Sequence, residues 1–140
     1  MPEKINAFLR STGQAEIADK GQMVRAVLES LALRYVQVIA WLEQISGHEI
    51  EVLHIVGGGI KNELLNQLTA NATGKTVVTG PVEATVLGNI LMQAKAMGQI
   101  GSLAEGRALV AKSFKTKTYR PKDRRAWKAF GKKAEAILRS

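Results

Sequence analysis

Cysteine is absent from the 140 residues of this chain. Its absence excludes a disulfide framework, a thiol nucleophile and a thiolate metal site. Long apolar runs are missing too, since none approaches the roughly 18 residues that a membrane-spanning helix needs. Residues 1–10 lack the apolar centre of a secretory signal peptide. We therefore expect a cytoplasmic protein with no membrane partner.

The chain also lacks internal repeats and low-complexity segments. Its 46% apolar and 23% charged residues are typical of one globular domain. Residues 1–106 carry 8 basic and 10 acidic side chains, whereas residues 107–140 carry 12 basic and 2 acidic ones. The basic excess behind the net charge of +8 therefore lies in the last quarter of the chain, and the two parts need separate interpretation.

The spacing of apolar residues predicts an α/β fold with the order helix, strand, helix, strand, helix. After a lead-in over residues 1–18, we expect a long amphipathic helix from Asp19 to Ser46, a buried strand Glu51–Val56, a helix Asn62–Thr73, a strand Thr76–Thr79 and a helix Glu83–Met97. The two strands should run parallel with a right-handed crossover. The residues expected to point inward are Leu64, Leu65, Leu68 and Ala72 in one helix, and Val86, Leu87, Ile90, Leu91, Ala94 and Met97 in the next.

The basic end of the chain is expected to hold a short helix Leu103–Ala111, an extended stretch and a final helix Asp123–Leu138. We place the body at residues 19–111 and the tail at 112–140. Basic residues interleaved with aromatics are found in nucleic-acid interfaces. The alternative is a solvated charged face on a helix whose Trp127, Phe130 and Ile137 pack inward. We favour the second interpretation, because no DNA- or RNA-binding module accompanies the tail, and we expect the tail to be dispensable for folding.

A glycine triplet, Gly57–Gly59, joins the first strand to the following helix in the run VGGGIKNELLNQL. Glycines let the backbone turn sharply and approach a ligand closely, and the helix offers unpaired N–H groups at its start, which suits a nucleotide. Tight turns between strand and helix also use glycine for geometry alone, so a purely structural role stays open. The triplet lacks the third glycine of the dinucleotide fingerprint. The segment Gly74–Thr76 is not a phosphate loop, because position 69 is threonine and a helix precedes it.

Candidates for catalysis are few. His48 and His54 are the only histidines, and we expect His54 to be a hydrogen-bonded core residue rather than a base. Glu83 begins a helix, where a carboxylate either caps the helix or orders a nucleotide pocket. We find no carboxylate pair, no Ser-His-Asp set and no metal-ligand spacing, so we expect no catalytic residue and no metal ligand in this chain.

Two segments resemble a known family. Val24–Tyr35 (VRAVLESLALRY) and Leu53–Ala94, which contains GGGIKN and GPVEATVLGN, closely resemble the C-terminal part of the rhamnulokinase subgroup in the FGGY family of carbohydrate kinases. The likeness extends over about residues 1–119. It implies part of an actin-like (ribonuclease H-like) ATPase domain. It also implies that Gly57, Gly58 and Gly59 abut a nucleotide and that Asn62 faces the adenine.

The resemblance further implies ATP or ADP as cofactor, with Mg²⁺ held by parts absent from this chain. A complete enzyme of this kind would transfer the γ-phosphoryl group of ATP to the 1-hydroxyl of L-rhamnulose, whereas this chain alone is expected to be inactive. Two strands leave both sheet edges unpaired, so we expect self-association or a complementary N-terminal chain. The alternative function is a non-enzymatic module that binds nucleic acid or protein through the basic tail.

Overall fold

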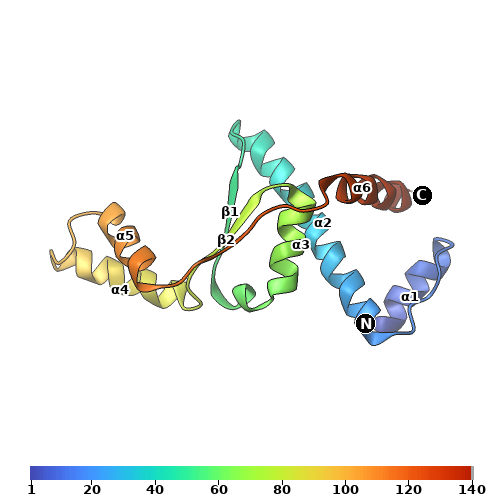
Figure 1. Cartoon of the computed structure of the whole chain (residues 1–140), viewed down its shortest axis with the longest axis horizontal. Coiled ribbons are helices and arrows are strands. Elements are labelled where there is room, and N and C mark those ends of the chain that lie inside the picture. The colour runs from blue at the N-terminus through green and yellow to red at the C-terminus, as the bar shows by residue number, and fades with distance from the viewer. Residues whose placement is uncertain (140) are drawn as a thin grey trace.

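The computed structural model describes residues 1–139 and combines six helices with one three-stranded sheet in that range. The elements are α1 (Pro2–Ser11), α2 (Lys20–Ser46), β1 (Val52–Ile55), the 3₁₀ turn η1 (Gly57–Lys61), α3 (Glu63–Thr73), β2 (Thr76–Thr79), α4 (Ala84–Ala96), α5 (Leu103–Ser113), β3 (Lys117–Tyr119) and α6 (Arg124–Arg139). The molecule is elongated, with the sheet, α2 and α3 in the middle and the α4–α5 pair at one end (Figure 1).

Helix α2 has both of the ends that the sequence predicts. Asp19 precedes it, and the Asp19 Oδ1 accepts a hydrogen bond of 2.8 Å from the Gln22 backbone N–H. Gly47 follows it with φ of 70°, the left-handed conformation that commonly ends a helix. The helix packs mainly against α3. The predicted long helix is confirmed, but Val24, Leu31 and Ile45 of its apolar stripe are exposed.

The sheet has the order β1-β2-β3. Strands β1 and β2 run parallel, with Leu53 opposite Val77 and Ile55 opposite Thr79, so the predicted parallel pair is confirmed. Strand β3 pairs antiparallel with β2, which places Tyr119 opposite Val77. The sequence interpretation missed β3, because it treated residues 112–122 as an extended part of the tail. The sheet therefore extends past the expected end of the body at residue 111.

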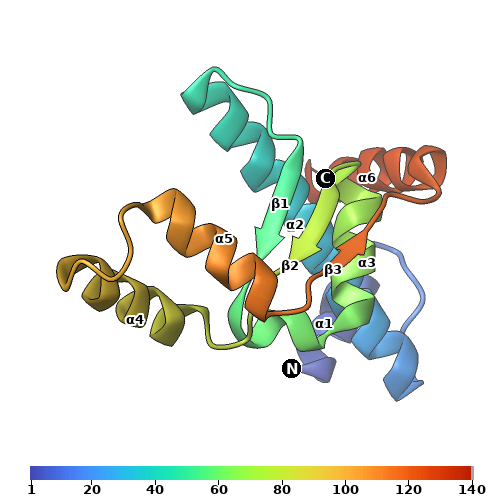
Figure 2. The same ribbon diagram turned by 60° about the vertical axis from the view of Figure 1, so that its left-hand side comes forward.

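One face of the sheet forms the core. Ala70 of α3, Val77 and Tyr119 are buried together, with Leu53 and Ile55 packed beside them. Figure 2 shows α2 and α3 behind the three strands. Successive strand residues point to opposite faces, so His54 faces away from α3 and is exposed. The expectations of a buried β1 and a core His54 are therefore wrong.

Two expected helix faces are correct only in part, since Leu68 is buried and Leu87 and Leu91 are half-buried. In α4, Val86, Ile90 and Met97 are exposed, with Met97 at 73% exposure just beyond the end of the helix. The reason is position, because α4 projects from the sheet together with α5 and has little else to pack against (Figures 1 and 2). In α3 the expected Leu64 is exposed, and the buried residues are Asn66, Leu68, Thr69 and Ala70.

The basic tail is attached to the body by specific contacts. The Gln67 Nε2 donates to the Arg120 carbonyl at 2.9 Å, and the Lys122 backbone N–H donates to the Asn71 Oδ1 at 2.9 Å. Helix α6 turns a half-buried face inward that consists of Trp127, Gly131, Ala134 and Ile137, whereas the expected Phe130 is exposed. Because Tyr119 is a core residue, the expectation that the tail is dispensable conflicts with the structure.

Candidate functional site

The glycine turn η1 lies where β1 ends. Gly57 has φ of 74°, a left-handed conformation that strongly favours glycine. Its backbone N–H donates to the Pro81 carbonyl at 3.1 Å, and the Gly80 N–H donates to the Ile55 carbonyl at 2.8 Å. The turn therefore lies against the loop that follows β2. The carboxyl ends of the two parallel strands meet at this edge, which is where open α/β sheets bind ligands.

The three predicted glycines differ in what surrounds them. A methyl group added to Gly58 would meet no atom within 4 Å, so its backbone is open to an approaching group. A methyl group on Gly59 would contact the Ile55 side chain at 3.5 Å. Gly57 supplies the unusual backbone conformation. Of the three, Gly58 alone has open space where a side chain would project.

Asn62, the fourth predicted site residue, caps α3. Its Oδ1 accepts a hydrogen bond of 3.0 Å from the Leu65 backbone N–H, and its own backbone N–H donates to the Gly59 carbonyl at 3.2 Å. The side-chain oxygen is thus committed to the helix start. The Nδ2 amide is the part of Asn62 that is left to donate to a ligand.

Asn66 is a residue of this region that the sequence interpretation missed. It is 1% exposed, and its Nδ2 donates to the Ile60 carbonyl within η1 at 3.0 Å. Its Oδ1 is buried without a hydrogen-bond partner among residues 1–139. The apolar spacing of the leucines around it concealed its position, because that spacing predicted a different buried face. The only available signal was a polar residue one helical turn after the cap Asn62.

An ion pair connects two elements that lie next to the turn, β3 and α3. The Lys117 Nζ lies 2.7 Å from the Glu63 Oε2, which joins β3 to the first turn of α3. The hydrogen bond to the Glu63 carboxylate raises the pKa of Lys117 above its ordinary value. Both side chains are more than half exposed, so solvent screens the pair. The pair orients two elements next to the turn and contributes little stability.

A second ion pair lies at the opposite edge of the sheet. The Lys75 Nζ contacts the Glu43 Oε1 at 2.8 Å and the Glu49 Oε1 at 3.4 Å. The hydrogen bond from Lys75, followed by that from the Ile50 N–H, lowers the pKa of Glu43, and the bond to Glu43 raises the pKa of Lys75. These contacts join the end of α2 to the start of β2. Their role is structural.

Potential metal ligands are not clustered in the described part of the chain. Within residues 1–139, no group of three or more histidine and acidic side chains is arranged to hold a metal ion. Mg²⁺ in proteins is bound by carboxylates and substrate phosphates in octahedral geometry. Glu83 precedes α4, but its side chain makes no capping hydrogen bond, and it is exposed.

Within residues 1–139, no helix is long and apolar enough to cross a membrane.

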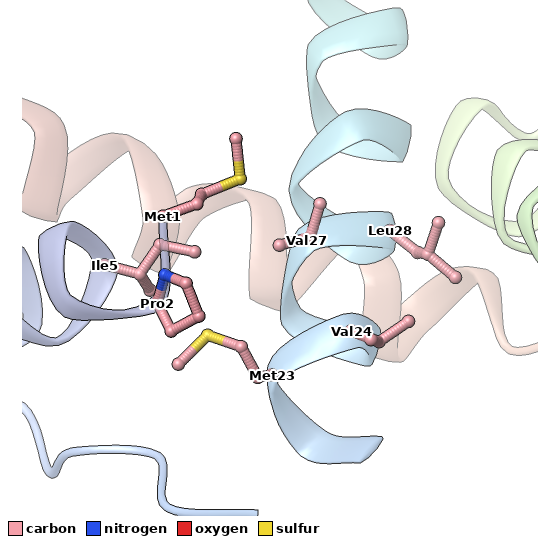
Figure 3. A pocket seen from close by; sticks show the side chains of 7 residues that line it. All are labelled: Met1, Pro2, Ile5, Met23, Val24, Val27 and Leu28. Atoms are coloured by element: carbon pink, nitrogen blue, oxygen red, sulfur yellow. The ribbon is translucent and has the colours of Figure 1, made fainter. Parts of the chain in front are cut away.

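An apolar hollow of about 290 Å³ lies between α1 and α2 (Figure 3). Its lining consists of Met1, Pro2, Ile5, Met23, Val24, Val27 and Leu28, all apolar. None of these residues belongs to the glycine turn or to the loop after β2. The hollow is therefore separate from the predicted site and offers no polar group to orient a nucleotide.

The parallel strands β1 and β2 are joined by the crossover helix α3, and an open glycine turn lies at their carboxyl ends. This arrangement defines a two-layer α/β domain. Residues 1–97 match a family model described as the FGGY family of carbohydrate kinases, C-terminal domain. The chain belongs to this family. The C-terminal domain of these kinases has the ribonuclease H-like, actin-like ATPase fold, so the expected fold class and the resemblance are both confirmed.

The chain is similar to proteins named rhamnulokinase. One from Bacteroides thetaiotaomicron is 48% identical over 129 residues, which cover 92% of this chain and 27% of that protein. One from Bacillus subtilis is 41% identical over 123 residues, which cover 88% of this chain and 25% of that protein. The chain thus spans about a quarter of the length of the curated relatives it matches. The likeness is to their C-terminal portion, and it does not favour the alternative of a nucleic-acid-binding module.

Proposed function

We propose that this chain is the adenine-nucleotide-binding, C-terminal portion of a carbohydrate kinase that acts on L-rhamnulose. The observation that carries the proposal is the family match over residues 1–97, which includes the glycine turn. The names of the relatives support the sugar. In the whole protein, the γ-phosphoryl group of ATP would pass to the 1-hydroxyl of L-rhamnulose.

The local geometry supports a role in holding the nucleotide. The open Gly58 backbone allows close approach, and the start of α3 supplies N–H groups and the positive end of a helix dipole. Asn62 would donate from its Nδ2 to the adenine while its Oδ1 continues to cap α3. Phosphoryl transfer also needs a base for the attacking hydroxyl and a held Mg²⁺. We assign both to the remainder of a full-length kinase, so the chain alone is expected to bind weakly and to have no turnover.

The proposal includes a partner. Helix α2 carries a stripe of exposed apolar residues at spacings of three, four and seven, and within the described residues β1 pairs on one side only, with β2. The stripe consists of Val24, Leu31, Tyr35, Val38, Leu42 and Ile45. The relatives are about four times as long as the matched segment. We assign the stripe and the free β1 edge to contact with the remainder of a full-length kinase, or with a second copy when that part is missing.

Calorimetric titration with ADP tests the nucleotide site. Gly58→Ala places a methyl group in the open space, and Asn62→Ser keeps a capping oxygen while it removes the amide donor. We expect each substitution to weaken ADP binding by about tenfold without loss of folding. Gly88→Ala is the matched control, because its methyl group also meets no atom within 4 Å but lies on α4.

The proposal of a nucleotide site fails if the unmodified chain binds no ADP at about 1 mM, or if Gly58→Ala and Gly88→Ala bind ADP equally well. A coupled assay with ATP and L-rhamnulose tests the expectation that this chain alone does not transfer the phosphoryl group. Turnover by the 140-residue chain alone would show that it contains catalytic groups.

A further inference from the structure

Asn66 is a buried polar residue with incomplete hydrogen bonding. It lies near the start of α3 and is 1% exposed. Its Nδ2 donates to the Ile60 carbonyl, whereas its Oδ1 has no partner among the described residues. An unsatisfied buried acceptor destabilises the folded state, and a leucine of similar size would avoid that loss. The asparagine therefore carries a stability cost that packing alone does not explain.

The one side-chain hydrogen bond that Asn66 makes reaches back to the glycine turn. The turn η1 is tied at its start by the Gly57 N–H on the Pro81 carbonyl. Near its end, the Ile60 carbonyl is tied to α3 by the Asn66 amide at 3.0 Å. The open Gly58 lies between these two ties. Without the Asn66 amide, the second half of the turn would lose its side-chain anchor to the helix.

We infer that Asn66 is a positioning residue that holds η1 in the open, ordered shape needed to receive a nucleotide. The inference rests on the proposed nucleotide site. Asn66 itself is too deeply buried to touch the ligand and acts through the Ile60 carbonyl. An ordered turn binds more tightly because it loses less conformational freedom when the ligand arrives. The cost of the unsatisfied Oδ1 is then the consequence of keeping a donor at this position.

Asn66→Leu separates positioning from packing, because it keeps the volume and removes both the donor and the unsatisfied acceptor. We expect an unchanged or higher urea midpoint. We also expect amide hydrogen exchange at Gly58–Lys61 to become about tenfold faster relative to exchange at Leu68–Ala70, and ADP binding to weaken by about tenfold. Asn66→Ala, a smaller substitution, should give the same exchange pattern at a lower urea midpoint.

Asn71→Ala is the matched control. Asn71 lies on the same helix, and its Oδ1 accepts from the Gln67 Nε2 and the Lys122 N–H, so the variant also loses side-chain hydrogen bonds. It should lower the urea midpoint without changing exchange in the turn or ADP affinity.

The exchange pattern tests whether Asn66 holds η1 even without nucleotide data. Faster exchange confined to the turn in both Asn66 variants supports the inference. Exchange that is unchanged in the turn, or faster throughout α3, overturns it, because Asn66 would then serve packing. If the unmodified chain binds no ADP, the proposed function fails while the exchange comparison still tests whether Asn66 holds the turn.

Discussion

At single residues, the sequence is most informative where only one residue type satisfies the backbone. Gly57 is such a position, since its φ of 74° favours glycine and the triplet indicated a sharp turn there. The capping role of Asn62 follows a local pattern, because asparagine is a preferred residue at the start of a helix. The bond from Asn66 to Ile60 depends on how the turn folds back on α3, which no local pattern encodes.

Gly57→Ala should destabilise the fold by about 1–2 kcal/mol, because an alanine in the left-handed conformation places its Cβ too close to the following carbonyl oxygen. Space is not the limit here, since the nearest atom to an added methyl group is the Val82 carbonyl oxygen at 3.8 Å. Urea unfolding followed by circular dichroism measures the loss. Gly88→Ala, on a helix without positive φ, should not show it. Equal stabilities of the two variants would contradict the assigned strain.

Removal of the ion pair by Lys75→Met should lower the urea midpoint in a pH-dependent manner. Because contact with Lys75 lowers the pKa of Glu43 below its ordinary value of 4.5, the pair stabilises the fold above that pH and loses effect as pH falls through the lower, folded value. The pKa of Lys75 is raised above 10.5, so its contribution persists up to that pH and is lost beyond it.

The difference in urea midpoint between Lys75→Met and the unmodified chain should therefore be constant from about pH 6 to 9 and shrink below about pH 4.5. Midpoints measured at several pH values check this. A difference that stays constant down to about pH 3 would show that the methylene chain of Lys75, rather than its charge, stabilises the contact.

At the level of elements, periodicity predicted the helices and the parallel strand pair but not β3. Lys117–Tyr119 has three residues in a basic stretch and no apolar alternation, so it becomes a strand only by pairing with β2. Burial was predicted less well than element type. The apolar face of α4 satisfies a helical pattern, yet what covers it depends on where the helix projects.

Removal of residues 112–140 should unfold the sheet region, because it deletes β3 and the core residue Tyr119, which is 7% exposed. Removal of residues 123–140 alone should leave the sheet folded at reduced stability. The single substitution Tyr119→Ala should cost about 3 kcal/mol, as expected for a large core side chain. Far-ultraviolet circular dichroism with urea titration compares the three. If the chain without residues 112–140 is as stable as the unmodified chain, Tyr119 does not contribute to the stability of the core.

For the whole molecule, the arrangement of exposed apolar surface indicates how the chain associates more clearly than its overall composition does. The sheet is covered by α3 on one face, and β1 has a free edge in the described structure. Ile45, at the end of the α2 stripe, is 84% exposed. Monomeric proteins rarely leave such continuous apolar surface in water. The chain spans about a quarter of the length of its relatives, and the proposed partner of these surfaces is the remainder of a full-length kinase.

The isolated chain should therefore self-associate. Two copies of the α2 stripe can bury each other because leucine, valine and tyrosine recur at the spacing of a helix-packing seam. Sedimentation equilibrium should give an average mass above 15.2 kDa that rises with concentration. The double variant Val38→Lys/Leu42→Lys places charges in the seam and should return the mass toward the monomer, whereas Val86→Lys/Ile90→Lys on exposed α4 should not.

The β1 edge offers a competing route to association, by addition of a strand from another copy. Because that route uses backbone groups, charges on α2 would leave the mass high, and the seam would then be excluded as the main contact. A monodisperse monomer across a wide concentration range would contradict both routes. If a separately expressed N-terminal fragment of a relative is added, it should displace the second copy and give a one-to-one complex, because it would cover the same apolar stripe and the same strand edge.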